Sequence, residues 1–173
     1  MEKHPILEFI ERLPFFQEFS DDEKSKLVRK DGIFEKYKAG DTIISEGDTG
    51  SALFVVLTGA ILIVKSTVAN VKDGHISLQE PEIITIAELK AGSIFGEVSL
   101  VSDRPRNTSA LADSDQVVVM KISKEVIESF NLSIQKKFQT QLIQILVQRL
   151  DDMNTKYINL KAAASKEQKK PSA

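Results

Sequence analysis

Hydrophobic positions change their period twice along the chain. Apolar residues first recur at helical spacing over 5–12, with Pro5 at the first helical position, and a capping box opens a second helix at Ser20. From Gly32 onwards the period is two. Six short segments rich in β-branched and aromatic residues follow, namely 33–38, 42–45, 53–58, 61–66, 83–87 and 117–122. The pattern predicts N-terminal helices followed by a sandwich or barrel of short strands.

Helical spacing returns near the C-terminus. Ser123 is a predicted N-cap, a break is expected near Asn131, and apolar residues then recur at three- and four-residue steps over 134–160. Part of this segment follows the 4-3-4-3 rhythm of a coiled-coil seam, at Leu146, Leu150, Met153, Tyr157 and Leu160. We therefore expect one long C-terminal helix that serves as a lid or in dimerisation. The segment 161–173 has no apolar stripe, and we expect it to be disordered.

These elements give a mixed α and β chain that is mainly β. The expected order is N-terminal helices over 1–32, a β-roll over 33–122, C-terminal helices over 123–160 and the tail. Within the roll, Asp73-Gly74 predicts a two-residue hairpin turn between 67–72 and 75–79. The segment 68–81 is either a hairpin that touches a partner or a solvated loop, and we favour the loop.

Candidate chemistry is concentrated between the expected strands 83–87 and 117–122, in Phe95–Leu100 and Pro105–Ser109. Gly96 has no Cβ and lets the backbone approach a ligand, while a helical turn over 98–101 would offer free N–H groups to a phosphate. Arg106 adds a permanent cation whose planar fork matches phosphate oxygens. The carboxylate of Glu97 would repel a phosphate, so it should accept from a hydroxyl instead. Together these groups describe a site for a sugar phosphate.

The ordered set Phe95-Gly96-Glu97, Leu100 and Pro105-Arg106 resembles the phosphate-binding cassette of cyclic nucleotide-binding domains, a β-roll family. We place the cassette at 95–110. The resemblance implies that Glu97 takes the ribose 2′-hydroxyl and that Arg106 takes the cyclic phosphate. It also implies that backbone N–H groups at Ser99 and Asn107 reach the phosphate, and it covers roughly residues 5–160.

The resemblance further implies a purine pocket. Apolar residues at the matching positions are Ala87, Leu89 and Phe95, for which core packing is the other interpretation. From the C-terminal helix, Met153 and Asn154 are placed near the purine, although dimer seam and plain helix surface are their alternatives. The predicted ligand-binding residues are Ala87, Leu89, Phe95, Gly96, Glu97, Val98, Ser99, Arg106, Asn107, Thr108 and Asn154.

The base preference is predicted from the position after the cassette arginine. Many cGMP-preferring members of the family carry Thr there, whereas this chain has Asn107 and places Thr108 one residue later. We therefore predict cyclic AMP as the ligand. Cyclic GMP stays open, because the side chain of Asn107 could also accept from the guanine amino group.

Composition removes several other functions. The net charge of −2 over 173 residues gives no basic field for nucleic acid, and the absence of cysteine excludes disulfides. The two histidines, His4 and His75, cannot supply a histidine-rich metal site. The start of the chain lacks a signal-peptide pattern, and no apolar run is long enough to span a bilayer. We expect a cytoplasmic protein with neither metal nor resident cofactor.

The order of elements resembles the sensor half of the catabolite activator protein, a member of the family. Only a short polar tail follows the long helix here, so we expect no direct DNA binding and no membrane contact. The leading hypothesis is a stand-alone cAMP receptor that signals to an unknown effector protein through nucleotide-dependent docking of its C-terminal helix. That docking is coupled either to homodimer formation or to exposure of a partner surface. The alternative is a nucleotide-independent interaction or scaffold module on the same fold. We do not expect an enzyme, because metal-dependent chemistry needs clustered ligands.

Overall fold

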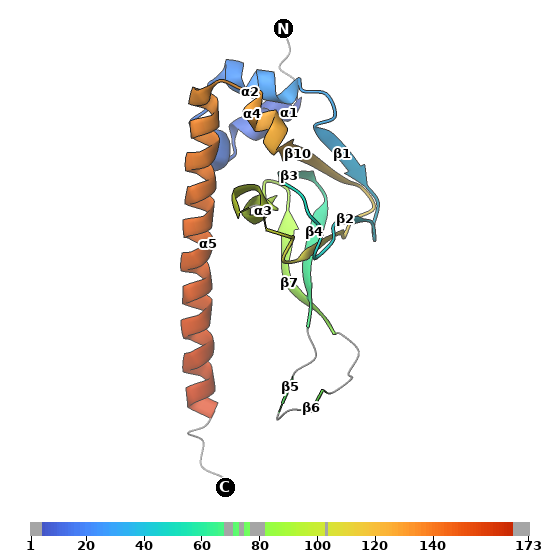
Figure 1. Ribbon diagram of the computed structural model, residues 1–173, viewed down its shortest axis with the longest axis vertical. Coiled ribbons are helices and arrows are strands. Elements are labelled where there is room, and N and C mark those ends of the chain that lie inside the picture. The colour runs from blue at the N-terminus through green and yellow to red at the C-terminus, as the bar shows by residue number, and fades with distance from the viewer. Residues whose placement is uncertain (1–4, 68–70, 73–74, 77–81, 103, 168–173) are drawn as a thin grey trace.

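The structure is a computed structural model that describes residues 5–67, 71–72, 75–76, 82–102 and 104–167 of the chain. A β-roll occupies the centre, a group of helices covers one end of it, and one long helix runs along its side (Figure 1). The N-terminal helices are α1 (Pro5–Glu11), the 3₁₀ turn η1 (Pro14–Phe16) and α2 (Asp21–Val28). Further along are α3 (Glu97–Ser102), α4 (Lys124–Glu128) and α5 (Leu132–Glu167).

Two four-stranded antiparallel sheets form the roll. The first has the order β1 (Phe34–Tyr37), β10 (Val117–Ser123), β3 (Ala52–Thr58) and β8 (Ile94–Phe95). The second has the order β2 (Thr42–Ile44), β9 (Ser109–Ala112), β4 (Ala60–Ser66) and β7 (Ile83–Lys90). All six predicted strands are present. The two that the sequence pattern missed, β8 and β9, flank the cassette and thereby place it between the sheets.

A third, two-stranded sheet extends the β4–β7 hairpin. Its strands are β5 (Val71–Lys72) and β6 (His75–Ile76), with Lys72 opposite His75. This register agrees with the predicted two-residue turn, although Asp73 and Gly74 lie outside the described residues. At the base of the extension, the Thr67 N–H donates to the Glu82 carbonyl oxygen at 2.8 Å.

The strand β3 separates two hydrophobic cores. Its side chains alternate, so that Phe54 and Val56 pack between the sheets while Leu53 and Val55 pack against the helices. Burial on both faces explains why this strand reads as a continuous apolar run. Under the helices, Phe15, Phe16, Phe19 and Phe138 form a ring cluster with neighbouring centroids 4.9–6.3 Å apart. Since each buried aromatic side chain contributes about 1.5–3 kcal/mol, this cluster fixes the start of α5 on the N-terminal helices.

The helix caps follow the predicted signals. Ser20 and Glu23 form a reciprocal capping box at α2, and the Ser123 side chain accepts from the Val126 N–H at α4. The expected break between α4 and α5 is also present. There, the Asn131 side-chain oxygen accepts from the Ile134 N–H at 3.1 Å, which satisfies a first-turn donor of α5.

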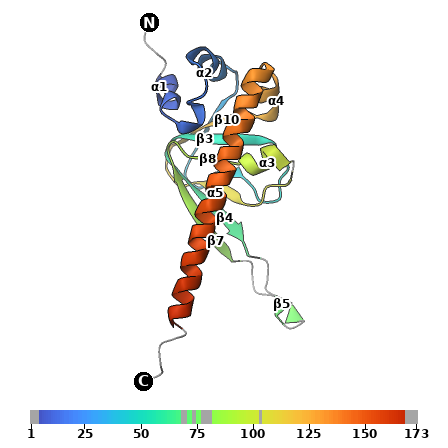
Figure 2. The same ribbon diagram turned by 90° about the vertical axis from the view of Figure 1, so that its left-hand side faces the viewer.

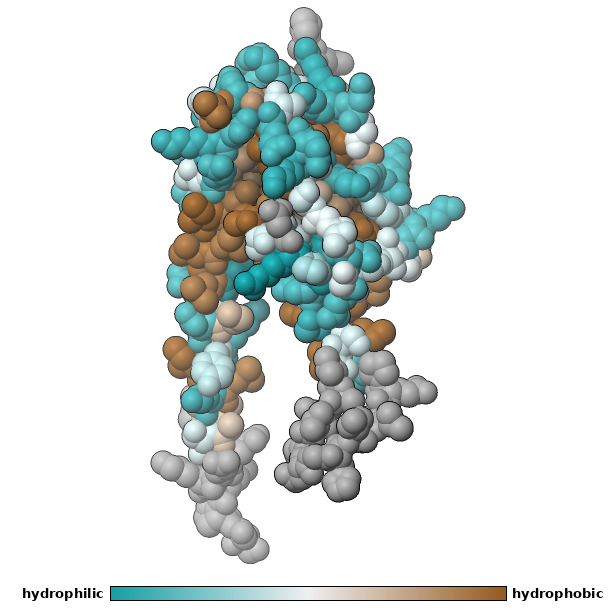
Figure 3. All heavy atoms as spheres, in the orientation of Figure 1, coloured by the Kyte–Doolittle hydropathy of each residue, from teal (hydrophilic) through white to brown (hydrophobic). Residues whose placement is uncertain are grey.

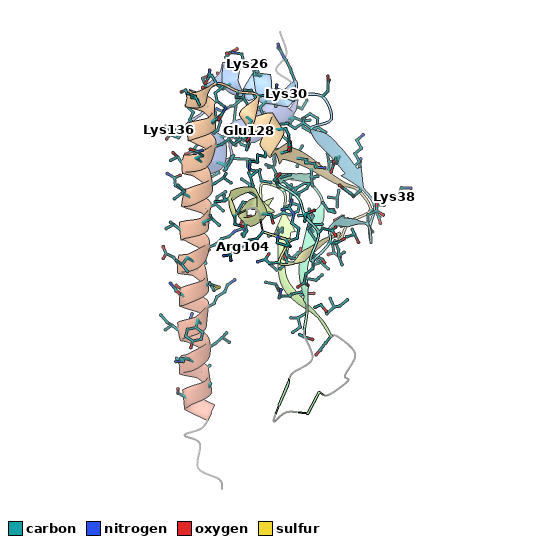
Figure 4. All side chains as sticks on the ribbon, viewed as in Figure 1. Lys26, Lys30, Lys38, Arg104, Glu128 and Lys136 are labelled. Carbon is teal, nitrogen blue, oxygen red and sulfur yellow. The ribbon has the colours of Figure 1, made fainter. Side chains whose placement is uncertain are left out.

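The long helix α5 changes its environment part-way along its length. Ile134, Phe138 and Leu142 are buried against the helical end of the molecule. After them, α5 passes α3 and projects beyond the roll in the same general direction as the β4–β7 hairpin (Figures 1 and 2). Side chains on this distal half extend into open space (Figure 4).

The predicted disorder from residue 161 is wrong as far as Glu167, because α5 continues to that residue. The segment 161–167 lacks an apolar stripe but consists of Lys, Ala, Ser and Glu, and all but Ser are strong helix formers that propagate an existing helix. Residues 168–173 lie outside the described part. No helix in the described residues is both long and apolar enough to cross a membrane.

Candidate functional site

A cavity of about 530 Å³ lies between the second sheet, the cassette and α5. It brings together every predicted site residue except Asn154. The lining consists of Ile44, Ile63, Ile86, Ala87, Leu89, Phe95, Gly96, Glu97, Val98, Ser99, Arg106, Asn107, Thr108, Ala110, Arg149, Asp152, Met153 and Lys156. Segments far apart in the sequence therefore converge on one hollow.

Gly96 makes the sharp change of direction from β8 into α3. Its φ is +79°, a conformation that other L-residues adopt at a cost. A Cβ at this position would also lie 3.0 Å from the Ala52 carbonyl oxygen and 3.0 Å from Nη1 of Arg106. Glycine is therefore strongly favoured at this turn, which leads directly into α3 at Glu97 on the cavity wall.

Arg106 is a buried cation on that wall, with 8% of its surface exposed. Its Nη1 donates to the Gly96 carbonyl oxygen at 2.7 Å, and its Nη2 donates to the Ala52 carbonyl oxygen at 3.0 Å. The guanidinium also lies 5.9 Å from the centre of the Phe54 ring. Burial lowers the pKa of Arg106, and the nearby charge of Glu97 raises it in part.

None of these contacts neutralises the charge. Among the described residues, no carboxylate forms an ion pair with Arg106, and both of its acceptors are neutral carbonyl groups. A buried guanidinium stays protonated at neutral pH and is stabilised by a nearby anion. The wall of the cavity therefore favours an anionic group.

Glu97 supplies the second polar group and is 1% exposed. Its Oε1 accepts from Nη1 of Arg149, which reaches across from α5. Its Oε2 is buried and has no hydrogen-bond partner among the described residues. An unpaired carboxylate oxygen is costly at such a position, so Oε2 is suited to accept from a hydroxyl of a molecule in the cavity.

Arg149 is a lining residue with contacts to the cassette that the sequence did not predict. Besides Glu97, it donates through Nη2 to the Ile94 carbonyl oxygen, so one side chain links α5 to both ends of the β8–α3 turn. Only its place beside the residues predicted to reach the purine could have drawn attention to it. A single arginine on an exposed helix carries no other signal.

The phase of α5 decides which of its residues reach the cavity. Arg149, Asp152, Met153 and Lys156 are spaced at i, i+3, i+4 and i+7, which places them on one helix face. Asn154 follows Met153 by about 100° around the helix and is exposed outside the lining. The lining therefore includes Met153 and not Asn154, and contact of either residue with a ligand stays a prediction.

The opposite wall is apolar. Ile63, Ile86, Ala87 and Leu89 contribute it from β4 and β7. Phe95 also borders the cavity, but it is buried and stacks on Phe54 with ring centres 5.1 Å apart. Phe95 therefore belongs to the core between the sheets as well as to the lining.

The cavity combines an anion site, a hydroxyl acceptor and an apolar wall, which is the arrangement expected for a nucleotide. A family model described as the cyclic nucleotide-binding domain matches residues 34–131. The chain belongs to this family. The matched segment contains the whole roll, the cassette and α4.

Relatives of known function support the assignment. The cAMP-dependent protein kinase regulatory subunit of Aspergillus niger is 31% identical over 118 residues, which cover 68% of this chain and 25% of that protein. Human cGMP-dependent protein kinase 2 is 29% identical over 126 residues, which cover 73% of this chain and 15% of the kinase. The chain thus spans a quarter or less of the length of these two relatives.

Solved structures confirm the fold. A cyclic nucleotide-binding domain from Methylobacillus flagellatus KT is 25% identical with a TM-score of 0.67, covering 89% of this chain and 81% of that one. The catabolite activator protein of Thermus thermophilus is 23% identical with a TM-score of 0.65, covering 86% and 63% of the two chains. The predicted family and the predicted roll with helices at both ends are both confirmed.

Proposed function

We propose that this chain is a receptor for a cyclic purine nucleotide, with cyclic AMP as the principal ligand. The observation that carries the proposal is the pairing, in one cavity, of the unpartnered Oε2 of Glu97 with the buried charge of Arg106. A cyclic nucleotide presents a ribose 2′-hydroxyl and an anionic phosphate on one rigid bicycle. The first group would satisfy Glu97, and the second would neutralise Arg106.

The apolar wall and α5 would enclose the base. A purine stacked between β7 and Met153 buries apolar surface that would otherwise face water. Met153 is 61% exposed and its flexible side chain adapts to an irregular surface. Arg149 would hold this part of α5 at the cavity by its bond to Oε1 of Glu97, leaving Oε2 for the ribose.

The signal would then leave the domain through α5. A nucleotide that contacts both the cassette and α5 binds the docked arrangement better, and only such differential affinity shifts the two populations. The outer face of α5 carries exposed apolar residues at Ile143, Val147, Leu150, Tyr157 and Ile158. Hydrophobic side chains of α5 are visible along one flank of the molecule (Figure 3).

That outer face would be the output surface of the receptor, presented to a separate effector protein or to a second copy of the chain. The two outcomes differ in a direct measurement. Light scattering of the purified protein with and without nucleotide gives the mass of the particle, so a doubled mass would identify the homodimer and an unchanged mass would leave the effector.

Isothermal titration of the full chain tests the binding proposal. We expect cyclic AMP to bind at least tenfold more tightly than 5′-AMP, which has the same base and sugar but an open phosphate of different charge and position. If neither cyclic AMP nor cyclic GMP binds at millimolar concentration, the receptor proposal is wrong and the nucleotide-independent scaffold module takes its place.

Cyclic GMP is the second candidate ligand, and two lining residues favour it. Asp152 lines the cavity from α5 and carries a carboxylate, and guanine offers two adjacent N–H donors where adenine offers one amino group. Thr108 also lines the cavity and can accept from the guanine amino group. Competition between the two cyclic nucleotides in one titration decides the preference.

A further inference from the structure

We call the segment of the cassette that contains Arg106 and Asn107 the cassette limb. Side chains attach this limb to the roll at the point where the backbone pairing between β4 and β9 ends. The pairing of β4 with β9 ends at Val64 and Ser109. One residue further along β4, Nζ of Lys65 donates to the Asn107 carbonyl oxygen at 2.6 Å. The same Nζ donates to Oε1 of Glu46 at 2.8 Å. Lys65 thus bridges the limb and the turn that follows β2.

Glu46 contributes further bonds to this arrangement, and we call Glu46 and Lys65 together the clamp. Its Oε2 accepts from the Ser66 N–H at 3.1 Å, and its own N–H donates to the Ser109 hydroxyl at 2.9 Å. The bond to Lys65 and the bond to Ser66 together lower the pKa of Glu46. The carboxylate is therefore ionised at neutral pH and holds the ammonium group of Lys65 beside the Asn107 carbonyl oxygen.

The backbone of the same turn holds the preceding peptide. The Gly47 N–H donates to the Arg106 carbonyl oxygen at 2.8 Å, and the Arg106 N–H donates to the Asp48 carbonyl oxygen at 2.8 Å. In a trans peptide the C=O and the next N–H point in opposite directions. Fixing the carbonyl groups of Arg106 and Asn107 therefore aims the N–H groups of Asn107 and Thr108 away from the clamp.

The clamp residues lie outside the cavity lining, whereas Asn107 and Thr108 belong to it. We infer that Glu46 and Lys65 are positioning residues for the phosphate of the ligand: they hold the limb so that the N–H groups of Asn107 and Thr108 face the cavity beside the Arg106 guanidinium. Neither residue touches the ligand. The inference rests on the proposed function, since it assigns a role within the same nucleotide site.

The experiment measures the affinity of the full chain for three ligands by isothermal titration. These are cyclic AMP, its 2′-deoxy analogue, and the weaker-binding phosphorothioate diastereomer, in which one exocyclic oxygen is sulfur. The variants are Lys65→Met, Lys65→Arg and Glu46→Gln. The matched control is Lys90→Met. Lys90 is an exposed lysine at the C-terminal end of β7, and its Nζ lies 3.5 Å from Oε1 of Glu88.

For Lys65→Met we expect cyclic AMP to bind about three- to tenfold more weakly. Lys65→Arg should stay within about twofold of the wild type, because a guanidinium can reach both acceptors. Glu46→Gln should lie between them, and Lys90→Met should match the wild type. The discriminating readout is the ratio of the affinity for cyclic AMP to the affinity for each analogue. In Lys65→Met, the loss of affinity caused by sulfur in the phosphate should be smaller than in the wild type. The loss caused by the missing 2′-hydroxyl should be the same as in the wild type.

Two results would overturn the positioning role. One is unchanged affinity for cyclic AMP in Lys65→Met. The other is an equal loss for all three ligands together with a lower melting temperature, which would make Lys65 a general support of the fold. Failure of the wild-type chain to bind either cyclic AMP or cyclic GMP is a separate outcome that would reject the proposed function itself.

Discussion

The roll wall of the cavity is buried and held from several directions, whereas the α5 wall is half open to solvent. On the roll side, Arg106 and Glu97 are 8% and 1% exposed, and Arg106 is fixed by hydrogen bonds to the carbonyl groups of Gly96 and Ala52. On the α5 side, the Arg149 side chain is 44% exposed and is the one residue of that helix whose described hydrogen bonds reach the cassette. A preorganised wall is suited to set affinity, and a loosely attached one is suited to respond to the ligand.

The largest effect is expected from the roll wall, with Arg106→Ala. A buried charge pair that loses one partner typically costs about 2–5 kcal/mol, so the affinity for cyclic AMP should fall at least tenfold. Titration of both proteins measures the change. Arg104→Ala is the control, because Arg104 is exposed two residues earlier and should leave the affinity within about twofold.

Arg106 also holds two backbone carbonyl groups, so its variant needs a folding measurement. Circular dichroism and the melting temperature should show a folded roll. Unchanged affinity in folded Arg106→Ala would mean that the anion site has been assigned to the wrong cation.

The next effect tests the α5 wall as a whole, by truncation after Val147. Truncation after Phe130 would remove Ile134, Phe138 and Leu142 from the core, whereas the residues from Gln148 to Ser165 are exposed. Truncation after Val147 should therefore preserve the roll. Loss of about 50–80 Å² of apolar cover on the purine corresponds to roughly 1–2 kcal/mol, or about a five- to thirtyfold weaker affinity.

Light scattering on the truncated protein examines the output surface at the same time. Any dimer of the full chain should disappear, since Leu150, Tyr157 and Ile158 are gone. A truncated chain that binds as tightly as the full one would show that α5 is not a lid.

A smaller effect isolates the single link between the two walls, with Arg149→Ala. Glu97 would then keep a buried carboxylate without its partner from α5, and the free energy of unfolding should decrease by about 1–3 kcal/mol. Nucleotide affinity should fall by about three- to tenfold, because α5 docks less often. Hydrogen exchange should rise in 143–160 but not in the roll.

The control for this link is Lys156→Ala, which removes another cation of the α5 wall from the cavity lining. It should leave hydrogen exchange along α5 unchanged. If Lys156→Ala loosens the helix as much as Arg149→Ala does, the bond to Glu97 is not what attaches α5.

The same contrast explains what could be predicted from the sequence. Gly96, Glu97 and Arg106 lie within twelve residues of one another, and each carries its chemistry in its residue type. The partner of Glu97 is 52 residues away and depends on how α5 docks. The strand β8 has only two residues, and β9 has the sequence Ser-Ala-Leu-Ala, which lacks the β-branched and aromatic residues that indicated the other strands.

Two expectations on α5 differ from the structure, namely a place for Asn154 in the cavity and disorder from residue 161, and both differences have a local cause. Met153 and Asn154 are neighbours in sequence, but only one of two consecutive helical residues can face a given wall. The missing apolar stripe after residue 160 indicated only that nothing packs there. Helix propensity, which is high for the Ala, Lys and Glu of that segment, decides whether an established helix continues.

The smallest effect concerns recognition of the base, and the substitution of Asp152 tests it. Its Oδ1 accepts from Nε2 of Gln148 at 3.0 Å one turn earlier on α5, so the carboxylate is oriented before a ligand arrives. Asp152→Ala should lower the affinity for cyclic GMP by about threefold and leave that for cyclic AMP nearly unchanged, because an exposed hydrogen bond contributes only about 0.5–1 kcal/mol. Competitive titration of both nucleotides against wild type and variant gives the ratio, and Gln148→Ala serves as the control for orientation. Equal losses for both nucleotides would mean that Asp152 acts on the docking of α5 and not on the base, and the preference would then rest on Asn107 and Thr108 of the roll wall.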